Sequence, residues 1–154
     1  MSPRVVMLLS RPTRPLFNNR RNIAISAKRE IRLWDPATGK AVGGVLRGHK
    51  QWVTSLSWEP MHRNAACERL ASASKDKTVR IWNVRTGSCE ASLSGHTDSV
   101  ECVKWGGVGL LYSASRDRTI KVWGAEADEA QAGHTVGKLV RTLSGHGHRV
   151  NVSE

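Results

Sequence analysis

Two stretches decide the fold: GHKQWVTSLSWEP (48–60) and, after a short connection, RLASASKDKTVRIWN (69–83). The same pattern returns as GHTDSVECVKWGG (95–107) and LLYSASRDRTIKVWG (110–124). Both copies run in one order: a Gly-His pair, an alternating segment that ends in Trp, a Ser-rich segment, a turn centred on Asp, and a second alternating segment that ends in Trp. The chain is therefore built from an internal repeat, and its period has to be read before its individual elements.

Each complete copy predicts four short strands, because alternating apolar residues are separated by turn residues. In the order of the chain, the expected strands are Val53–Trp58, Leu70–Ser74, Thr78–Trp82, Cys89–Ser94, Val100–Trp105, Leu110–Ser115, Thr119–Trp123 and Lys138–Ser144. The Gly-His pairs begin at residues 48, 95 and 145, close to the ~40 to 45-residue period of propeller blades. A sheet this small buries a face by stacking on a similar sheet, so the sequence favours consecutive blades.

The predicted fold class is all-β, a segment of a β-propeller that forms an incomplete ring. EIRLWDPATGK (30–40) matches only the end of the repeat, and GHGHRVNVSE (145–154) only its beginning. The expected organisation is a basic, disordered leader over 1–28, a partial blade over 29–47, full blades over 48–94 and 95–144, the second with an acidic insertion over 125–137, and the start of another blade over 145–154.

Charge is concentrated in the leader. The chain has 24 Lys and Arg against 13 Asp and Glu, a net charge of +11, and residues 1–28 contain no acid. Such a leader could contact RNA phosphates, or it could act as a mitochondrial transit peptide. Pro12 and Pro15 would interrupt the helix that a transit peptide forms. The apolar runs are too short to cross a membrane. The three cysteines show no CxxC spacing, which disfavours a disulfide framework and favours a reducing compartment.

The repeated residues resemble WD repeats. Gly48-His49 with Trp82, Gly95-His96 with Trp123, and the dipeptide Trp34-Asp35 carry the resemblance. In that family a His, a strand Ser, the turn Asp and the last Trp form a hydrogen-bonded chain. Carried over by position, the resemblance implies two such structural tetrads: His49, Ser72, Asp76 and Trp82, and His96, Ser113, Asp117 and Trp123. Ser74 and Ser115 are the less favoured choices for the Ser position, and Lys28 stands where the first half-copy would have its Asp.

A closer resemblance is to the Notchless family, also called ribosome assembly protein 4. That family extends the first loop of one blade with Trp-Glu-Pro, His and Cys, as Trp58-Glu59-Pro60, His62 and Cys67 do in this chain. It also has Trp-Gly-Gly at the end of the next such strand, as in 105–107. The resemblance covers roughly residues 29–151 and corresponds to interior blades of a larger ring. It implies a non-catalytic scaffold in assembly of the large ribosomal subunit, located in the nucleolus or nucleus.

Enzymatic and ligand-binding functions receive little support from the motifs. Ser72, His49 and Asp76 are the residue types of a hydrolase triad, but no Gly-x-Ser-x-Gly elbow is present and the trio recurs in the second copy. His146 and His148 have no neighbouring acid or Cys to complete a metal site. The glycines lack the spacing of a phosphate-binding loop or a dinucleotide site. The prediction is therefore no enzyme, no cofactor and no metal.

One edge of the blades is expected to carry an interaction surface. In the family architecture, the loops that enter each blade and the turns between its second and third strands share one face of the ring. We call the residues at that face the basic rim: Lys50, Trp52, Lys75, Lys77, Asp98, Arg116, Arg118 and Arg149. Its expected partners are proteins of pre-ribosomal particles or ribosomal RNA, with further blades or self-association completing the ring. The alternatives are a solvated charged surface, or a general WD-repeat adaptor in signalling or ubiquitin pathways, in the cytoplasm.

Overall fold

The computed structural model describes residues 6–8, 23–60, 68–106, 109–125, 136–148 and 150. Within these ranges every regular element is a β-strand, and the strands form three antiparallel sheets of four. The all-β fold with stacked four-stranded blades is thereby confirmed. The first sheet contains β1 (Val6–Leu8), β2 (Ile23–Ala27), β3 (Glu30–Asp35) and β4 (Lys40–Arg47); the second contains β5 (Val53–Trp58), β6 (Arg69–Ser74), β7 (Thr78–Asn83) and β8 (Ser88–Ser94); the third contains β9 (Val100–Trp105), β10 (Leu110–Ser115), β11 (Ile120–Gly124) and β12 (Lys138–Leu143).

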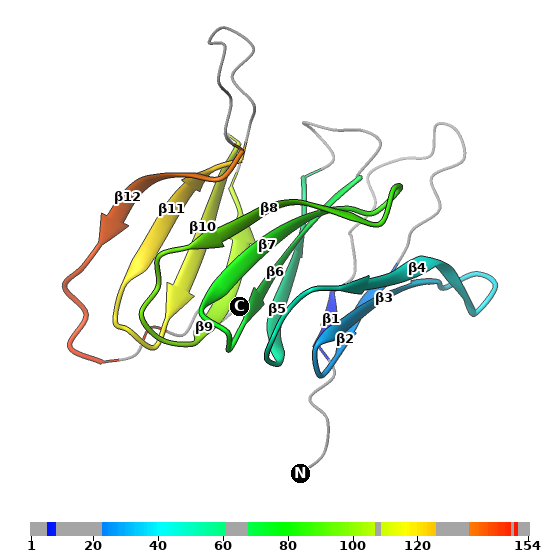
Figure 1. Ribbon diagram of the computed structural model, residues 1–154, viewed down its shortest axis with the longest axis horizontal. Coiled ribbons are helices and arrows are strands. Elements are labelled where there is room, and N and C mark those ends of the chain that lie inside the picture. Colours follow the sequence, from blue (N-terminus) through cyan, green and yellow to red (C-terminus); the bar gives the residue numbers. More distant parts are fainter. Residues whose placement is uncertain are drawn as a thin grey trace, which may run out of the picture.

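Strand order within each sheet follows the chain, and the sheets stand side by side like the blades of a fan (Figure 1). The second sheet lies between the other two. Its strand β6 is buried on both faces from Leu70 to Ser74, whereas the outermost strand β12 is exposed along its length. Burial therefore increases from the edge of the fan toward the middle sheet, as expected for sheets that cover each other face to face.

Polar side chains fix how the second and third sheets meet. Strand β5 lies beside β9, and the hydroxyl of Thr54 donates a hydrogen bond to the carbonyl oxygen of Val100. The hydroxyl oxygen of Ser57 accepts a bond of 3.1 Å from the backbone N–H of Trp105. Because these bonds join a side chain of one sheet to the backbone of the next, they set the register between neighbouring sheets.

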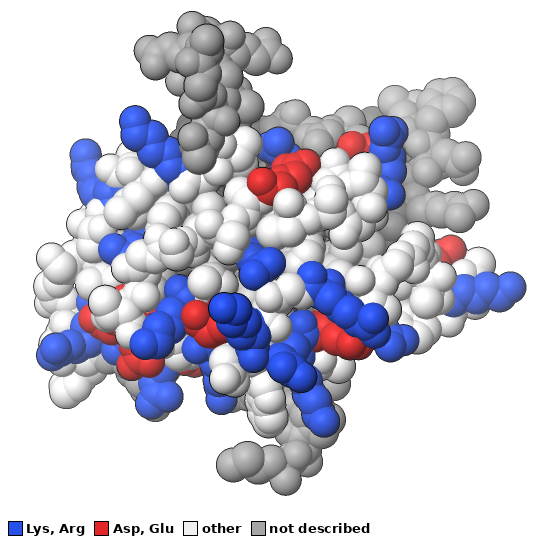
Figure 2. Space-filling view, viewed as in Figure 1, with Lys and Arg blue, Asp and Glu red and all other residues white. Residues whose placement is uncertain are grey.

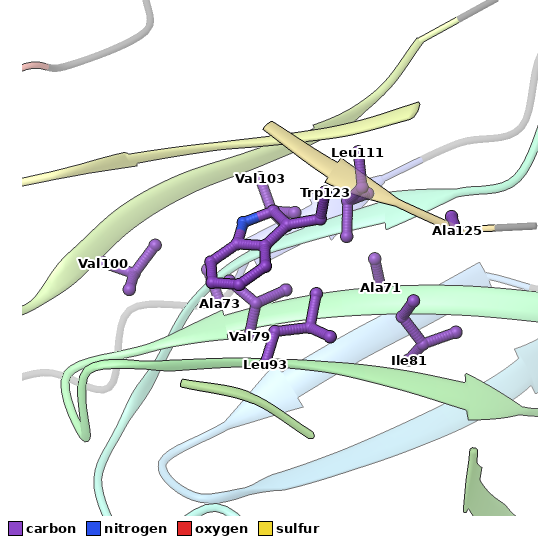
Figure 3. Packing of buried hydrophobic residues seen from close by; sticks show 10 residues of the cluster. All are labelled: Ala71, Ala73, Val79, Ile81, Leu93, Val100, Val103, Leu111, Trp123 and Ala125. Atoms are coloured by element: carbon purple, nitrogen blue, oxygen red, sulfur yellow. The ribbon is translucent and has the colours of Figure 1, made fainter. Parts of the chain in front are cut away.

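Two apolar cores fill the spaces between the sheets. One, between the first and second sheets, contains Leu33, Leu56 and Trp82. The other joins the second and third sheets, and Figure 3 shows Trp123 of β11 lying over Ala73 and Val79 of the second sheet. Trp82 and Trp123 are 1% and 2% exposed. The tryptophan that ends the third strand of each of these sheets therefore packs against the sheet before it.

The first sheet differs from the expectation of a disordered leader and a partial blade. Residues 23–27 form strand β2, which pairs with β3 over its full length, from Ile23 opposite Trp34 to Ala27 opposite Glu30. β1 pairs with β2 in turn. Ala24 and Ser26 are completely or almost completely buried. The segment IAISA is short, but β3 supplies hydrogen-bond partners and the second sheet supplies an apolar surface, so the tertiary contacts stabilise a strand there.

The other predicted strands lie within one residue of their expected bounds. Most of the acidic insertion predicted over 125–137, residues 126–135, lies outside the described residues. Arg149 of the basic rim also lies outside them. No helix long and apolar enough to cross a membrane occurs in the part of the chain that the structure describes.

Candidate functional site

A buried chain of hydrogen bonds crosses the second sheet. The indole N–H of Trp82 donates to the hydroxyl oxygen of Ser72 over 2.8 Å, and that hydroxyl lies 2.7 Å from Nε2 of His49. Nδ1 of His49 is 2.9 Å from Oδ2 of Asp76. The structure thus brings together the four residues that the WD-repeat resemblance placed in one tetrad, and Ser72 rather than Ser74 occupies the Ser position.

The donor and acceptor of each hydrogen bond in this series can be assigned, and the assignment fixes the protonation state of His49. An indole N–H can only donate, so the Ser72 oxygen accepts from Trp82 and its own hydrogen points to Nε2 of His49. His49 then carries its proton on Nδ1 and donates it to Asp76. A doubly protonated ring would leave the Ser72 hydroxyl hydrogen without an acceptor at a site that is 0% exposed. The arrangement therefore requires a neutral His49 and an ionised Asp76.

The third sheet repeats this arrangement. Trp123 donates to the Ser113 hydroxyl over 2.8 Å, Nε2 of His96 lies 2.8 Å from the same oxygen, and Nδ1 of His96 is 2.7 Å from Asp117. Each aspartate accepts further bonds from a threonine and from the backbone: Asp117 accepts from the hydroxyl of Thr119 over 2.6 Å and from the N–H of Thr97 over 3.0 Å. Every oxygen of the carboxylate is occupied from inside the blade.

The electrostatics agree with this direction of hydrogen bonding. Burial lowers the pKa of His49 and of His96, and this outweighs the opposing effect of the neighbouring aspartate in each sheet. Burial by itself raises the pKa of Asp117, but hydrogen bonds from Thr119, His96 and the backbone overcome it and lower the value to about 2. The pKa of Asp76 is lowered for the same reasons. Both histidines are therefore neutral and both aspartates charged at neutral pH.

The first sheet has no such chain among its described residues. The register places Ile23 opposite Trp34, as Leu70 stands opposite Trp82, so Ile25 occupies the position that Ser72 has in the second sheet. Its turn is also one residue shorter: Lys28 and Arg29 connect β2 to β3, where Lys75, Asp76 and Lys77 connect β6 to β7. This turn therefore contains no aspartate: Lys28 and Arg29 stand in place of the three residues of the other turn.

The basic rim lies where the turns between second and third strands meet the loops that enter each blade. These turns share the lower edge of the molecule in Figure 1, and Lys and Arg side chains gather along that edge in Figure 2, with Asp and Glu between them. The backbone N–H of Lys75 donates to the carbonyl oxygen of Trp52 over 2.9 Å, and that of Arg116 donates to the carbonyl of Ser99 over 2.9 Å. Turn and loop are thus held together in both sheets, so the rim residues of each blade are fixed side by side.

Lys75 and Trp52 are also joined through their side chains. The ammonium nitrogen of Lys75 lies 5.1 Å from the centre of the Trp52 ring, in the geometry of a cation–π contact. Trp52 is half-buried, whereas Lys50, Lys75, Lys77, Asp98, Arg116 and Arg118 are exposed.

The structure adds two residues to this surface, one that the sequence interpretation had assigned to the leader and one that it had assigned to the partial blade. Lys28 and Arg29 are exposed at the turn between β2 and β3, the counterpart of the rim turns in the other sheets. The backbone N–H of Val53 donates to the carbonyl oxygen of Lys28 over 2.7 Å, which ties this turn to the second sheet. The alternation in IAISA, followed by two basic residues and EIRLW, was the signal that could have identified this hairpin.

Comparison with known proteins adds the family context. The pattern of the family described as WD domain, G-beta repeat matches residues 41–83 and 87–124. Protein Notchless of Drosophila melanogaster is 50% identical over 116 residues, which cover 75% of this chain and 22% of that protein. Ribosome assembly protein 4 of Chaetomium thermophilum is 50% identical over 132 residues, covering 56% of this chain and 25% of that protein.

A third similar protein is the Ribosome biogenesis protein WDR12 homolog of Nematostella vectensis. It is 45% identical over 83 residues, which cover 52% of this chain and 19% of that protein. The chain therefore spans about a fifth to a quarter of the length of these curated relatives.

Proposed function

This chain belongs to the WD40 repeat family, and from that premise we propose that it is a non-catalytic interaction scaffold in assembly of the large ribosomal subunit. The observation that carries the proposal is the 50% identity with Protein Notchless over 75% of this chain. Two further similar proteins are named for ribosome assembly or ribosome biogenesis. The proposed location is the nucleolus and nucleus, where large-subunit assembly takes place.

A scaffold role is supported by the chemistry of the repeated polar residues. Ser72 and Ser113 are 0% exposed, and each hydroxyl group is already bonded to a histidine and to an indole N–H. A serine nucleophile must reach a substrate carbonyl, and neither hydroxyl has a path to solvent. The two chains of hydrogen bonds instead rigidify the sheets on which the turns are mounted.

The contact surface in this proposal is the basic rim, because its turns and loops are rigid and its cations are exposed. The proposed partners are components of pre-ribosomal particles. Long-range attraction between a positively charged surface and an acidic or phosphate-bearing partner would accelerate and orient their association.

Gradient sedimentation tests this function. The tagged protein, expressed at its natural level in its own cells, should sediment with precursors of the large subunit, while the tag alone stays at the top of the gradient. Mild depletion of an early large-subunit precursor should move the protein to lighter fractions. Persistent sedimentation in the light fractions, with no loss of large subunits on removal of the protein, would instead favour a general WD-repeat adaptor.

A further inference from the structure

We infer that the edge formed by the three second-to-third strand turns binds single-stranded RNA, through its phosphates and through one base stacked at Trp52. The residues that carry this inference are exposed cations, which we call the turn cations: Lys28, Arg29, Lys75, Lys77, Arg116 and Arg118. The inference deepens the proposed function, and it rests on that function in one respect. The surface itself recognises a flexible polyanion with unstacked bases, and ribosome assembly makes RNA the relevant one.

The aspartates nearest to the turn cations direct their carboxylates into the blades and away from these cations. The side chains of Asp76 and Asp117 are each only 6% exposed and accept hydrogen bonds from His49 and His96. Asp98 is the acid of the rim that is exposed to solvent. Within the described residues no ion pair involves a turn cation, although other surface arginines such as Arg47 and Arg69 form ion pairs.

The backbone at these turns would favour glycine over a cation. Lys28, Lys77 and Arg118 have φ values of 56°, 71° and 68°, in the left-handed region, and they are the described non-glycine residues with positive φ. This conformation is unfavourable for an L-residue with a side chain and open to glycine at no steric cost. The same strained choice occurs once in each sheet, always with a long cationic side chain. Folding does not require a cation at this position, which points to a role in binding.

Trp52 adds a surface on which a base can stack. Its ring already accepts the Lys75 ammonium at 5.1 Å, a contact worth little at an exposed site. A phosphate can recruit that ammonium while an unpaired base packs on the indole. Aromatic rings next to a row of cations are typical of proteins that bind single strands with little sequence preference.

The composition of the surface favours RNA over an acidic protein. Stable protein interfaces have an apolar centre surrounded by a polar margin. The large apolar side chains that the described residues expose are Tyr112, Leu139, Val140 and Leu143, and all of them belong to the third sheet, on β10 and β12 rather than at the turns. The edge itself offers mainly cations, with the exposed Asp98 and some other acids between them, and one aromatic ring. A row of charges across stacked sheets about 10 Å apart suits a polymer with regularly spaced phosphates.

The test uses the 154-residue chain and a fluorescently labelled 12-nucleotide oligouridine, with anisotropy recorded from about 50 to 300 mM salt. The rim variant is Lys77→Gly with Arg118→Gly, which removes two cations at positions where glycine suits the backbone. The matched control is Arg85→Gln with Lys138→Gln, which removes the same charge at the opposite edge of the sheets. Far-UV circular dichroism of both variants should match that of the unchanged protein.

Each phosphate contact contributes a slope of roughly 0.7 in a plot of log affinity against log salt, which is about fivefold at 0.1 M salt. The rim variant should therefore bind about 25-fold more weakly at 0.1 M salt, with a slope smaller by about 1.4. The control variant should bind within about twofold of the unchanged protein at low salt. Trp52→Leu should weaken binding by about tenfold, because the stacked base is lost.

Three results would overturn the inference. The first is no binding of the oligouridine by the unchanged chain. The second is equal loss in the rim and control variants, which would show attraction to net charge alone. The third is equally tight binding of poly-glutamate, lost in the rim variant but not affected by Trp52→Leu, which would identify an acidic protein surface as the partner. Sedimentation of the rim variant with pre-ribosomal particles distinguishes the outcomes, because the proposed function can stand when RNA binding at the rim fails.

Discussion

Ser72 shows how a single buried hydroxyl links the parts of one blade. It lies on β6, receives a hydrogen bond from Trp82 on β7, and gives its own hydrogen to His49 in the loop that enters β5. Asp76, in the turn after β6, holds the other side of the imidazole. Two strands and two connections are thus joined by groups whose hydrogen-bonding capacity is filled. Removing one of these side chains leaves the buried polar groups of its neighbours without hydrogen-bond partners, which lowers the stability of the fold.

Replacing Ser72 by Ala should lower the free energy of unfolding by roughly 1 to 3 kcal/mol, because the Trp82 N–H and the His49 Nε2 lose their partner in a buried site. The matched control is Ser92→Ala on β8, where the serine is exposed and the expected change is within about 0.5 kcal/mol. Urea unfolding followed by tryptophan fluorescence measures both. Equal stability of the two variants would contradict a structural role for the tetrad.

Acid should destabilise the fold well before its aspartates are protonated. The pKa of His49 and of His96 is lowered by burial below the ordinary value of 6.5, so the unfolded chain takes up these protons first. The stabilising contribution is complete above about 6.5 and is lost as the pH falls toward the folded-state pKa, by at most about 1.4 kcal/mol per pH unit for each histidine.

Unfolding free energies measured from pH 8 to pH 5 test this sign. They should decrease with acidification, and a double variant with His49→Gln and His96→Gln should show a flatter profile from a lower starting stability. A profile that is flat or rises toward pH 5 in the unchanged protein would mean that the histidines are charged in the fold. Below pH 3.8 a second loss should follow, as Asp117 approaches its pKa of about 2.

At the scale of elements, the hairpin turns combine a rigid backbone with a strained residue. In the second sheet the turn from Ser74 to Thr78 is closed by hydrogen bonds from Thr78 to the Asp76 carboxylate, and Lys77 follows with φ of 71°. One carboxylate oxygen of Asp76, Oδ1, therefore closes the turn by accepting from Thr78, and the other, Oδ2, accepts from His49. The residue after it accepts a left-handed conformation as the consequence.

Substitution at Lys77 should separate backbone strain from charge. Lys77→Gly should leave the free energy of unfolding unchanged or raise it by up to about 1 kcal/mol, because glycine relieves the positive φ while its greater freedom in the unfolded chain offsets part of the gain. Lys77→Val should lower it, because a β-branched residue is disfavoured there. The urea midpoint of Lys77→Gly should equal or exceed that of the unchanged protein. The midpoint of Lys77→Val should lie below it. A glycine variant less stable than the valine variant would show that the turn is not strained.

In the whole molecule, corresponding faces of the second and third sheets differ in their exposure to solvent. Leu93 pairs with Val79 on β7, and Leu143 pairs with Ile120 on β11 at the corresponding register. Leu93 is 4% exposed because the third sheet covers it, whereas Leu143 is 42% exposed. Tyr112 and Val140 extend this apolar surface on the third sheet. Sheets with open apolar faces associate with one another, because burial of that surface is favourable.

The 154-residue chain should therefore self-associate at micromolar concentration. Leu143→Lys should shift it toward the monomer, since a charge on that face opposes burial. Ser92→Lys adds the same charge at an exposed position of β8 and should leave the association unchanged. Sedimentation equilibrium of the three proteins gives the comparison. If the protein without substitutions were a monodisperse monomer with a sharp cooperative melt, the apolar face of the third sheet would be stable in contact with solvent.

The sequence by itself determined the repeat and the strands of two blades, because local alternation, turn chemistry and repeat spacing are properties of neighbouring residues. The positions of both tetrads followed from the resemblance of those repeats to WD repeats. Three features were decided only by the tertiary structure. Residues 23–27 form a strand because β3 and the second sheet supply partners and cover. His49 is neutral because of its burial, which no local pattern reports. Leu93 and Leu143 share a residue type and a register yet differ in exposure, since a neighbouring sheet covers only one of them.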